Sequence, residues 1–303
     1  TQSTWGSVQA STLSSTRNRA MKPTVRSILI REVWAHNVEE EFAIIRDLID
    51  EYSFISMDTE FPGVVFRAVD SSSSPNQNKS MGWHRLKPAE HYTYLKSNVD
   101  ALNLIQLGLT LSDSKGRLPD LGTTSHQFIW EFNFKDFDVH RDPHAPDSID
   151  LLRRQGIDFE RNRTEGIDSV LFAELMMCSG LICNDSIHWV TFHSAYDFGY
   201  LVKILTRTEL PAELDGFLAL MRVFFGGNVY DVKHVMRFCR SRLHGGLERV
   251  ARSLDINRVV GKCHQAGSDS LLTWHAFQKI KDVYFTGQAI KNHAGVLFGL
   301  EVY

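Results

Sequence analysis

The chain has 303 residues, with 33 lysine and arginine side chains against 36 aspartate and glutamate side chains, so its formal net charge is -3. Its hydrophobic and charged fractions, 43% and 23%, are those of an ordinary globular protein. This composition excludes a wholly disordered chain, a collagen-like repeat and a scaffold held together by disulfides. The nearly balanced charge also argues, at first sight, against a nucleic-acid-binding protein, because such proteins usually carry a basic excess.

Cysteine usage and hydropathy bear on the compartment. The chain has only Cys178, Cys183, Cys239 and Cys263, and no two of them form a C-x-x-C pair. We therefore expect free, mostly buried thiols in a reducing compartment. No apolar run approaches the roughly 20 residues that a membrane-spanning helix needs.

The N-terminal segment differs in composition from the rest of the chain. The first 31 residues carry five basic residues, no Asp or Glu, and many Ser and Thr. Such a composition is typical of an organelle transit peptide and also of a flexible tail. We favour a flexible tail over residues 1–26, with Met21 as an alternative start.

The next part of the chain contains a helix and several strands. Apolar spacings of three and four predict a helix over 37–52, and β-branched and aromatic residues predict a strand over 53–57. The polar, serine-rich segment 70–80 is expected to be a mobile loop. Two further apolar runs, 104–111 and 127–134, are predicted to be strands that pair with each other.

The second half of the chain is mainly helical. A short strand is predicted over 188–192, and the predicted helices cover 148–154, 167–179, 196–206, 212–224, 232–240, 247–254 and 268–285. Strands followed by helices and a returning strand indicate an α/β fold, with a mixed central sheet surrounded by helices. Since no linker interrupts the pattern, we expect a single domain over 27–303.

Two carboxylates stand at the end of the first predicted strand. Asp58 and Glu60 are separated by one residue, so in a strand both side chains point to the same face. Like charges this close repel, and a divalent cation such as Mg²⁺ would relieve the repulsion. The alternative is a solvated acidic pair at the edge of a strand.

Three further residues are candidates for the same site. Asp197 follows the strand over 188–192 and opens a helix, where it could serve a cleft or simply interact with the helix dipole. His264 and Asp269 lie five residues apart around Gly267. They can reach one site if the loop bends back and the following helix supplies the aspartate.

In combination, these segments resemble the DEDD superfamily of 3′→5′ exonucleases, in the subclass with a catalytic histidine. Within it the chain is most similar to the CAF/Pop family, over about residues 28 to 300. The resemblance is carried by Arg31-Glu-Val-Trp, Met57-Asp-Thr-Glu-Phe-Pro-Gly-Val-Val, Asn98-Val-Asp, Ile105-Gln-Leu-Gly-Leu, Phe192-His-Ser-Ala-Tyr-Asp-Phe-Gly-Tyr-Leu and His264-Gln-Ala-Gly-Ser-Asp-Ser-Leu-Leu-Thr.

The resemblance implies an RNase H-like exonuclease domain and assigns roles to individual residues. Asp58, Glu60, Asp197 and Asp269 would bind two divalent metal ions, Mg²⁺ or Mn²⁺, and His264 would act as the general base. The departures from the compact family pattern, the tail and the 70–80 loop, lie outside these motifs.

The family also implies an activity and partners. The expected function is a 3′→5′ exoribonuclease that shortens poly(A) tails, releases 5′-AMP and so promotes mRNA decay and translational repression. The expected partners are poly(A) RNA and, in the CCR–NOT complex, a Not-type scaffold and a Ccr-type nuclease, in cytoplasm and nucleus and with no membrane. The alternatives are another RNA or DNA exonuclease of the superfamily and a chain that serves mainly as an adaptor subunit.

Other residues near the motifs allow two readings each. His193 and Tyr196 could touch the terminal nucleotide or belong to the core, and Phe61 could stack on a base or fill the end of the sheet. Asp231 also fits the family pattern, and we interpret it as a structural cap rather than a metal ligand.

The small net charge conceals opposed regions. Residues 231–262 hold eight basic residues against three acids, and residues 1–35 hold five against one, which leaves -12 for the remainder. The basic stretch could be a track for RNA or a solvated helix face. The net charge of -3 therefore does not exclude nucleic acid.

Overall fold

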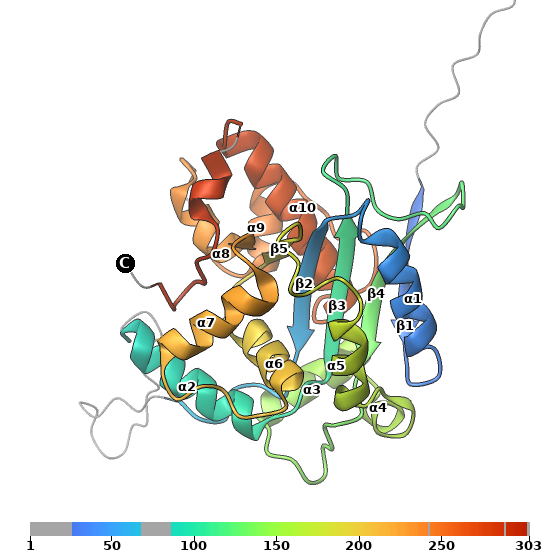
Figure 1. Cartoon of the computed structure of the whole chain (residues 1–303), viewed down its shortest axis with the longest axis vertical. Coiled ribbons are helices and arrows are strands. Elements are labelled where there is room, and N and C mark those ends of the chain that lie inside the picture. The colour runs from blue at the N-terminus through green and yellow to red at the C-terminus, as the bar shows by residue number, and fades with distance from the viewer. Residues whose placement is uncertain (1–25, 68–85, 242, 288, 302–303) are drawn as a thin grey trace, which may run out of the picture.

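The computed structural model describes residues 26–67, 86–241, 243–287 and 289–301. A six-stranded sheet forms its centre, with the strand order β1-β4-β3-β2-β5-β6 (Figure 1). The strands are β1 (Ser27–Val33), β2 (Phe54–Glu60), β3 (Gln106–Ser112), β4 (His126–Asn133), β5 (His188–Thr191) and β6 (Val229–Asp231).

The sheet is mixed, as the sequence predicts. Strands β2, β3 and β4 pair in antiparallel fashion, which confirms the predicted pairing of the runs over 104–111 and 127–134. Strand β1 adds parallel to β4, and β5 and β6 add parallel to β2 and to each other. Strand β2 therefore lies inside the sheet, with neighbours on both sides.

Helices cover both faces of this sheet (Figure 1). One hydrophobic cluster joins the sheet to α1, α2, α5, α6 and α7, and a second joins its other face to α8, α9 and α10. The helices are α1 (Val38–Leu48), α2 (Pro88–Ala101), α3 (Pro146–Gln155), α4 (Phe159–Glu165), α5 (Ser169–Met177), α6 (Ala195–Thr206), α7 (Leu214–Phe225), α8 (Val232–Val235), α9 (Leu247–Ser253) and α10 (Ala266–Tyr284).

Strand β3 shows how the sequence positions α10. Its leucines at 107, 109 and 111 belong to the first cluster, and alternation along a strand turns Gly108 and Thr110 to the opposite face. There the Thr110 hydroxyl hydrogen-bonds Ser270 Oγ of α10 at 2.8 Å. A Cβ atom on Gly108 would lie 1.9 Å from the carbonyl oxygen of Ala266, so the absence of a side chain allows the start of α10 to lie against β3.

Some elements differ from the sequence prediction. The strand predicted over 53–57 continues to Glu60, so both carboxylates of its motif lie within β2. The sequence analysis assigned no element to β1, α2, α4 or β6. In α2 a signal was present: Pro88 opens the helix, and Glu90 Oε2 accepts a hydrogen bond from the backbone N–H of Lys87 at 2.9 Å. The helix predicted over 232–240 ends at Val235 and continues as a 3₁₀ turn.

The predicted thiol state is correct in one respect and wrong in another. All four cysteines are free, but Cys178 and Cys183 are exposed, and the other two are partly buried. Cys178 ends α5, and Cys183 follows in a surface turn with a positive φ of 53°, which accounts for their exposure. Apart from Arg26, the predicted tail lies outside the described residues, as does the loop predicted over 70–80.

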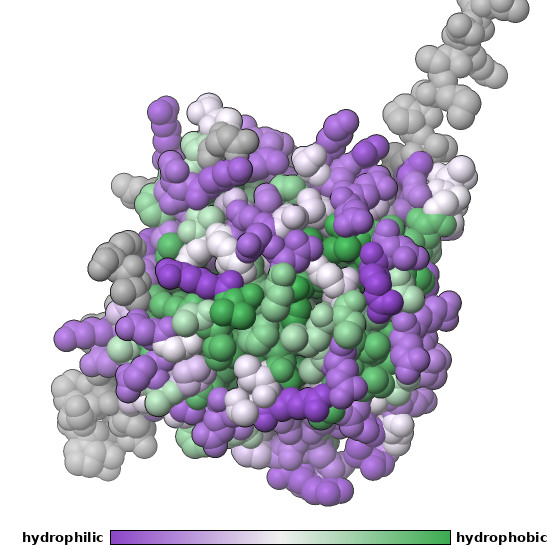
Figure 2. Space-filling model, in the orientation of Figure 1, coloured by the Kyte–Doolittle hydropathy of each residue, from purple (hydrophilic) through white to green (hydrophobic). Residues whose placement is uncertain are grey.

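Apolar side chains gather on part of the surface. Figure 2 shows them over α5, α6 and α7, with hydrophilic residues around them. Val170 and Met177 of α5 and Val223 of α7 are 44%, 49% and 61% exposed. Among the described helices, none is long and apolar enough to cross a membrane.

Candidate active site

The C-terminal end of β2 carries the first two predicted site residues. Asp58 and Glu60 share the face of β2 that α10 covers, as their spacing predicts. Asp269 lies in the first turn of α10, and carboxylate oxygens of the three residues lie within 4.8 Å of one another. The structure therefore brings together three of the four carboxylates that were predicted to share a site.

Asp197 reaches the same strand end from the first turn of α6, a helix on the other face of the sheet. Its Oδ1 atom accepts a hydrogen bond of 2.6 Å from the hydroxyl of Thr59, the residue between the two β2 carboxylates. Strand alternation explains the contact, since Thr59 points to the face opposite Asp58 and Glu60. No role was predicted for Thr59 from the sequence.

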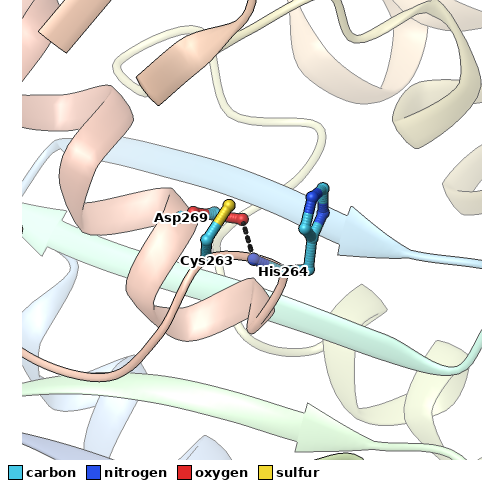
Figure 3. Close-up of side chains that lie close together, drawn as sticks. All are labelled: Cys263, His264 and Asp269. Atoms are coloured by element: carbon cyan, nitrogen blue, oxygen red, sulfur yellow. Dashed lines mark hydrogen bonds between the residues drawn. The ribbon is translucent and has the colours of Figure 1, made fainter. Parts of the chain in front are cut away.

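His264 lies at the edge of the cluster, in the turn that precedes α10. Its backbone adopts a positive φ of 60°, and its N–H donates to Asp269 Oδ2 at 2.9 Å (Figure 3). Its Nδ1 atom is 3.8 Å from Glu60 Oε1, and the imidazole is 43% exposed. The ring therefore lies beside a carboxylate and stays open to solvent.

Cys263 is a neighbour that the sequence analysis did not place in the site. Figure 3 shows its sulfur beside the Asp269 carboxylate, while the His264 ring projects away from both. Potential ligand atoms of the three residues lie within 4.8 Å of one another. Burial raises the pKa of the Cys263 thiol to about 11, so the neutral thiol predominates at neutral pH.

Burial and mutual repulsion raise the pKa values of the carboxylates. The pKa values of Asp58 and Glu60 lie well above their usual range, first because burial removes water and then because the Asp269 and Asp197 charges are close. Burial also raises the pKa of Asp269, which Arg258 opposes, and raises that of Asp197 to about 7. Such a cluster is costly unless cations compensate it.

Two cavities open beside the carboxylates. One, of about 320 Å³, is lined by Asp58, Glu60, His264 and Asp269. The other, of about 340 Å³, is lined by Asp58, Asp197 and a set of aromatic and basic side chains that includes Phe61, His91, Phe192, His193, Tyr196 and Lys233. Because Asp58, Thr59, Phe61 and Phe192 line both, the two cavities adjoin at the end of β2.

Phe61, Tyr196 and His193, for which the sequence allowed two roles each, both pack against other side chains and line a cavity. Phe61 stacks on Tyr196 at 5.3 Å between ring centroids, and both side chains line the second cavity. The ring of His193 meets Phe298 edge-on at 5.1 Å and lines the same cavity. Packing and access therefore do not exclude each other for these side chains.

Asp231 is a fully buried structural residue, as predicted. It caps α8 through the N–H of Lys233, at 2.9 Å. Its carboxylate also accepts hydrogen bonds from the backbone N–H groups of His193, Ser194 and Phe298. It therefore fixes the turn before α6, which carries Asp197.

The start of α10 is held by two side chains that the sequence analysis missed as site residues. Glu131 of β4 accepts hydrogen bonds from the Gly267 N–H at 3.0 Å and from the Gln106 side chain at 3.3 Å. Gln106 Oε1 in turn accepts from the Ala266 N–H at 3.5 Å. Burial raises the pKa of Glu131 to about 7. The motif containing Gln106 and the pairing of the two strands were predicted from the sequence, but the contacts of Gln106 and Glu131 with the start of α10 were not.

Part of the basic stretch over 231–262 is engaged within the protein. Arg237 forms an ion pair with Glu301 at 2.8 Å, and Lys233 donates to the carbonyl of Gly245. Arg258 pairs with Glu248 and with Asp269. These three side chains are therefore not simply a solvated helix face.

Comparison with known proteins identifies the family of the chain. Residues 33–174 match the CAF1 family ribonuclease. The chain is 51% identical over 276 residues to the probable CCR4-associated factor 1 homolog 7 of Arabidopsis thaliana, covering 91% of this chain and 94% of that protein. The chain belongs to the CAF1 ribonuclease family.

Solved structures of CAF1 family members have the same fold. Schizosaccharomyces pombe Pop2p in its Mg²⁺- and Mn²⁺-bound form aligns with a TM-score of 0.77 at 41% identity, over 89% of this chain and 99% of that one. Yeast CAF1, co-crystallised with the NOT1 MIF4G domain, aligns at 0.70 and 31% identity, over 89% and 96%. The predicted DEDD-type exonuclease fold is confirmed.

Proposed function

We propose that this CAF1 family member is a poly(A)-specific 3′→5′ exoribonuclease that releases 5′-AMP. The observation that carries the proposal is the carboxylate cluster of Asp58, Glu60 and Asp269, within 4.8 Å and with His264 at its edge. The Schizosaccharomyces pombe relative, 41% identical over 89% of this chain, is named poly(A) ribonuclease pop2. Shortening of poly(A) tails would promote mRNA decay and translational repression.

The donor set fits two divalent cations. Carboxylate oxygens are the ligands that Mg²⁺ and Mn²⁺ prefer. The pKa values of Asp58 and Glu60 are raised by burial and then by the neighbouring carboxylate charges, which bound cations would compensate. We assign the ligand role to Asp58, Glu60, Asp197 and Asp269. When bound, two such ions supply the positive charge that stabilises the attacking and leaving oxygens of an in-line displacement.

The surrounding residues orient this chemistry. We assign His264 the role of general base, because its exposed imidazole can take the proton of an attacking water next to the cluster. Thr59 holds Asp197, and the Asp269 carboxylate holds the turn that carries His264. The stacked pair of Phe61 and Tyr196 offers an apolar wall to the base of the terminal nucleotide.

The proposal includes assembly into a larger complex. Yeast CAF1 has been crystallised with the NOT1 MIF4G domain, and the Arabidopsis thaliana relative is named a probable CCR4-associated factor 1 homolog. The exposed apolar side chains on α5 and α7 are suited to contact with a protein partner. We therefore place the chain with a Not-type scaffold and a Ccr-type nuclease, in cytoplasm and nucleus.

A comparison of substrates tests the activity. Purified protein with Mg²⁺ is given 5′-labelled RNAs that share one body and end in adenosines, in cytidines or in uridines, together with DNA ending in deoxyadenosines. The proposal expects the adenosine-ending RNA to be shortened fastest. Equal rates on all tails, or a preference for the DNA, would favour another exonuclease of the superfamily.

The adaptor alternative needs a test in cells. In cells depleted of the native protein, Asp58→Ala or Asp269→Ala is expected to leave RNA decay slow, although each variant still binds its partners. If such a variant restored decay as well as the parent chain, the protein would act mainly as an adaptor. Co-purification with the complex verifies that each variant is assembled.

A further inference from the structure

Arg258, in the segment between α9 and α10, has every hydrogen-bond donor of its guanidinium engaged. Its side chain is only 14% exposed. Nε and Nη2 donate to Glu248, Nη1 donates to the Lys262 carbonyl and to the Ser268 hydroxyl, and Nη2 also donates to Asp269 Oδ1. A guanidinium carries five N–H donors, so these contacts satisfy all of them.

These contacts join three parts of the chain. Glu248 belongs to α9, Lys262 to the connecting loop and Asp269 to the first turn of α10. The loop that Arg258 closes contains His264, whose own N–H donates to Asp269 Oδ2 at 2.9 Å. Asp269 is therefore held through both oxygens, one by Arg258 and one by the turn that carries His264.

Within the part of the chain that the structure describes, Arg258 is the only lysine or arginine that lies within ion-pair distance of Asp58, Glu60, Asp197 or Asp269. Its charge lowers the pKa values of Asp58, Glu60 and Asp269, against the effect of burial. With two divalent ions bound, four carboxylates would balance their charge, and Arg258 would balance Glu248, so the site would carry no excess negative charge. A phosphodiester carries one negative charge, so loss of Arg258, which would leave Glu248 and Asp269 without this counter-ion, disfavours its binding.

We propose that Arg258 is a positioning residue: a built-in counter-ion that fixes Asp269 and the His264 turn, and whose charge keeps the metal-loaded site from repelling phosphate. Because all its donors are satisfied by protein acceptors, it acts through Asp269 and His264 and does not contact the substrate. The inference rests on the proposed function for its effect on RNA cleavage. Its effect on the loop does not depend on that function.

Two substitutions separate the effect of the Arg258 hydrogen bonds to α9, the loop and α10, which we call the clamp, from the effect of its charge. Arg258→Ala removes both, whereas Arg258→Lys keeps the charge but cannot reproduce the five planar contacts. Arg252→Ala is the matched control, because Arg252 is an exposed arginine of α9. Glu248→Ala is a second way to weaken the clamp, because it removes one acceptor of Arg258 without changing the carboxylate cluster.

The first readout is amide hydrogen exchange of peptides covering 258–269, measured in EDTA. We expect exchange in this loop to rise about tenfold in Arg258→Ala and Arg258→Lys, a loss equivalent to about 1.4 kcal/mol of local protection. Glu248→Ala should show a smaller rise, and Arg252→Ala none. Unchanged exchange in Arg258→Ala, or an equal rise over the whole chain, would overturn the clamp.

The second readout is steady-state cleavage of adenosine-ending RNA. Arg258→Ala should lower kcat/KM on the order of 100-fold, through both a lower kcat and a higher KM. Arg258→Lys should keep KM near that of the parent and lower kcat alone. If the lysine variant matched the parent in both constants, the contacts would be irrelevant and the proposal wrong. An inactive parent chain would refute the proposed function and leave the exchange result to decide the clamp.

Discussion

The hydroxyl of Thr59 donates a hydrogen bond of 2.6 Å to Asp197 Oδ1, although the two residues lie 138 positions apart in the chain. The bond joins the end of β2 to the start of α6 and holds the Asp197 carboxylate at the strand end, where Asp197 and Asp58 line one cavity. It is buried, so it orients Asp197 without competition from water.

This contact predicts that Thr59→Val impairs activity although valine has nearly the same shape. Removal of the hydroxyl frees Asp197 to rotate away from the cluster, and we expect kcat/KM to fall about tenfold, equivalent to about 1.4 kcal/mol. Thr59→Ser keeps the hydroxyl and is the control. Equal kinetics for the valine and serine variants would show that the bond does not position Asp197.

Repulsion within the cluster predicts that an inactivating substitution stabilises the metal-free protein. Asp58→Asn removes a carboxylate whose own pKa is raised by burial and then by the charges of Asp269, Asp197 and Glu60. In EDTA we expect its Tm to exceed that of the parent by about 2–4 °C, as a gain of about 1 kcal/mol would produce in a domain of this size. Asp50→Asn, at an exposed position, should leave Tm unchanged. A Tm below that of the parent would contradict the account.

The pH dependence of stability follows from the raised pKa values. Asp197 and Glu131 have folded-state pKa values of about 7, above the ordinary values of 3.8 and 4.5, so the folded state binds protons more tightly than the unfolded state. The resulting stability is fully present below about pH 4 and is lost as pH rises through 7. In EDTA, Tm should therefore fall between about pH 5.5 and 7.5.

Divalent cations should change that profile, because they compensate the same carboxylates. With Mg²⁺ present, the fall in Tm toward neutral pH should be smaller, and the stabilisation by Mg²⁺ should be greater at pH 7.5 than at 5.5. Asp197→Asn should flatten the profile in EDTA. A Tm in EDTA that rises over this range would show that these carboxylates are not protonated in the folded protein.

Glu131 is predicted to anchor the start of α10. Glu131→Leu leaves the buried N–H of Gly267 without its acceptor, which should cost about 1–3 kcal/mol in the free energy of unfolding. Glu131→Gln retains an acceptor oxygen and should cost less than half as much. Urea denaturation of both variants in EDTA makes the comparison, and equal losses would exclude the anchor.

Short sequence spacings were enough to predict much of the site. The i, i+2 pattern of Asp58 and Glu60 and the approach of His264 and Asp269 are local geometry. Asp197 was a candidate from its position between a strand and a helix, and the family resemblance assigned it to the site. The supporting contacts depend on tertiary structure: Thr59 meets Asp197 across the sheet, and Arg258 meets Asp269 through a loop whose path no spacing specifies.

The fold was predictable to a similar degree. Long periodic segments such as α10 and the leucine-rich β3 were found, because burial imposes a clear pattern on them. Strand β6 has only three residues, too few to show a period, and α2 has apolar residues at helical spacing within a largely polar sequence. Its proline and capping glutamate were the signals that could have identified it.

The most direct test follows a 5′-labelled RNA that ends in adenosines during incubation with the purified chain and Mg²⁺. The account predicts a ladder that shortens one nucleotide at a time from the 3′ end, with 5′-AMP as the product. EDTA should stop the reaction, excess Mg²⁺ should restore it, and Asp58→Asn should abolish it. Internal cleavage products, or shortening that continues in EDTA, would contradict the account.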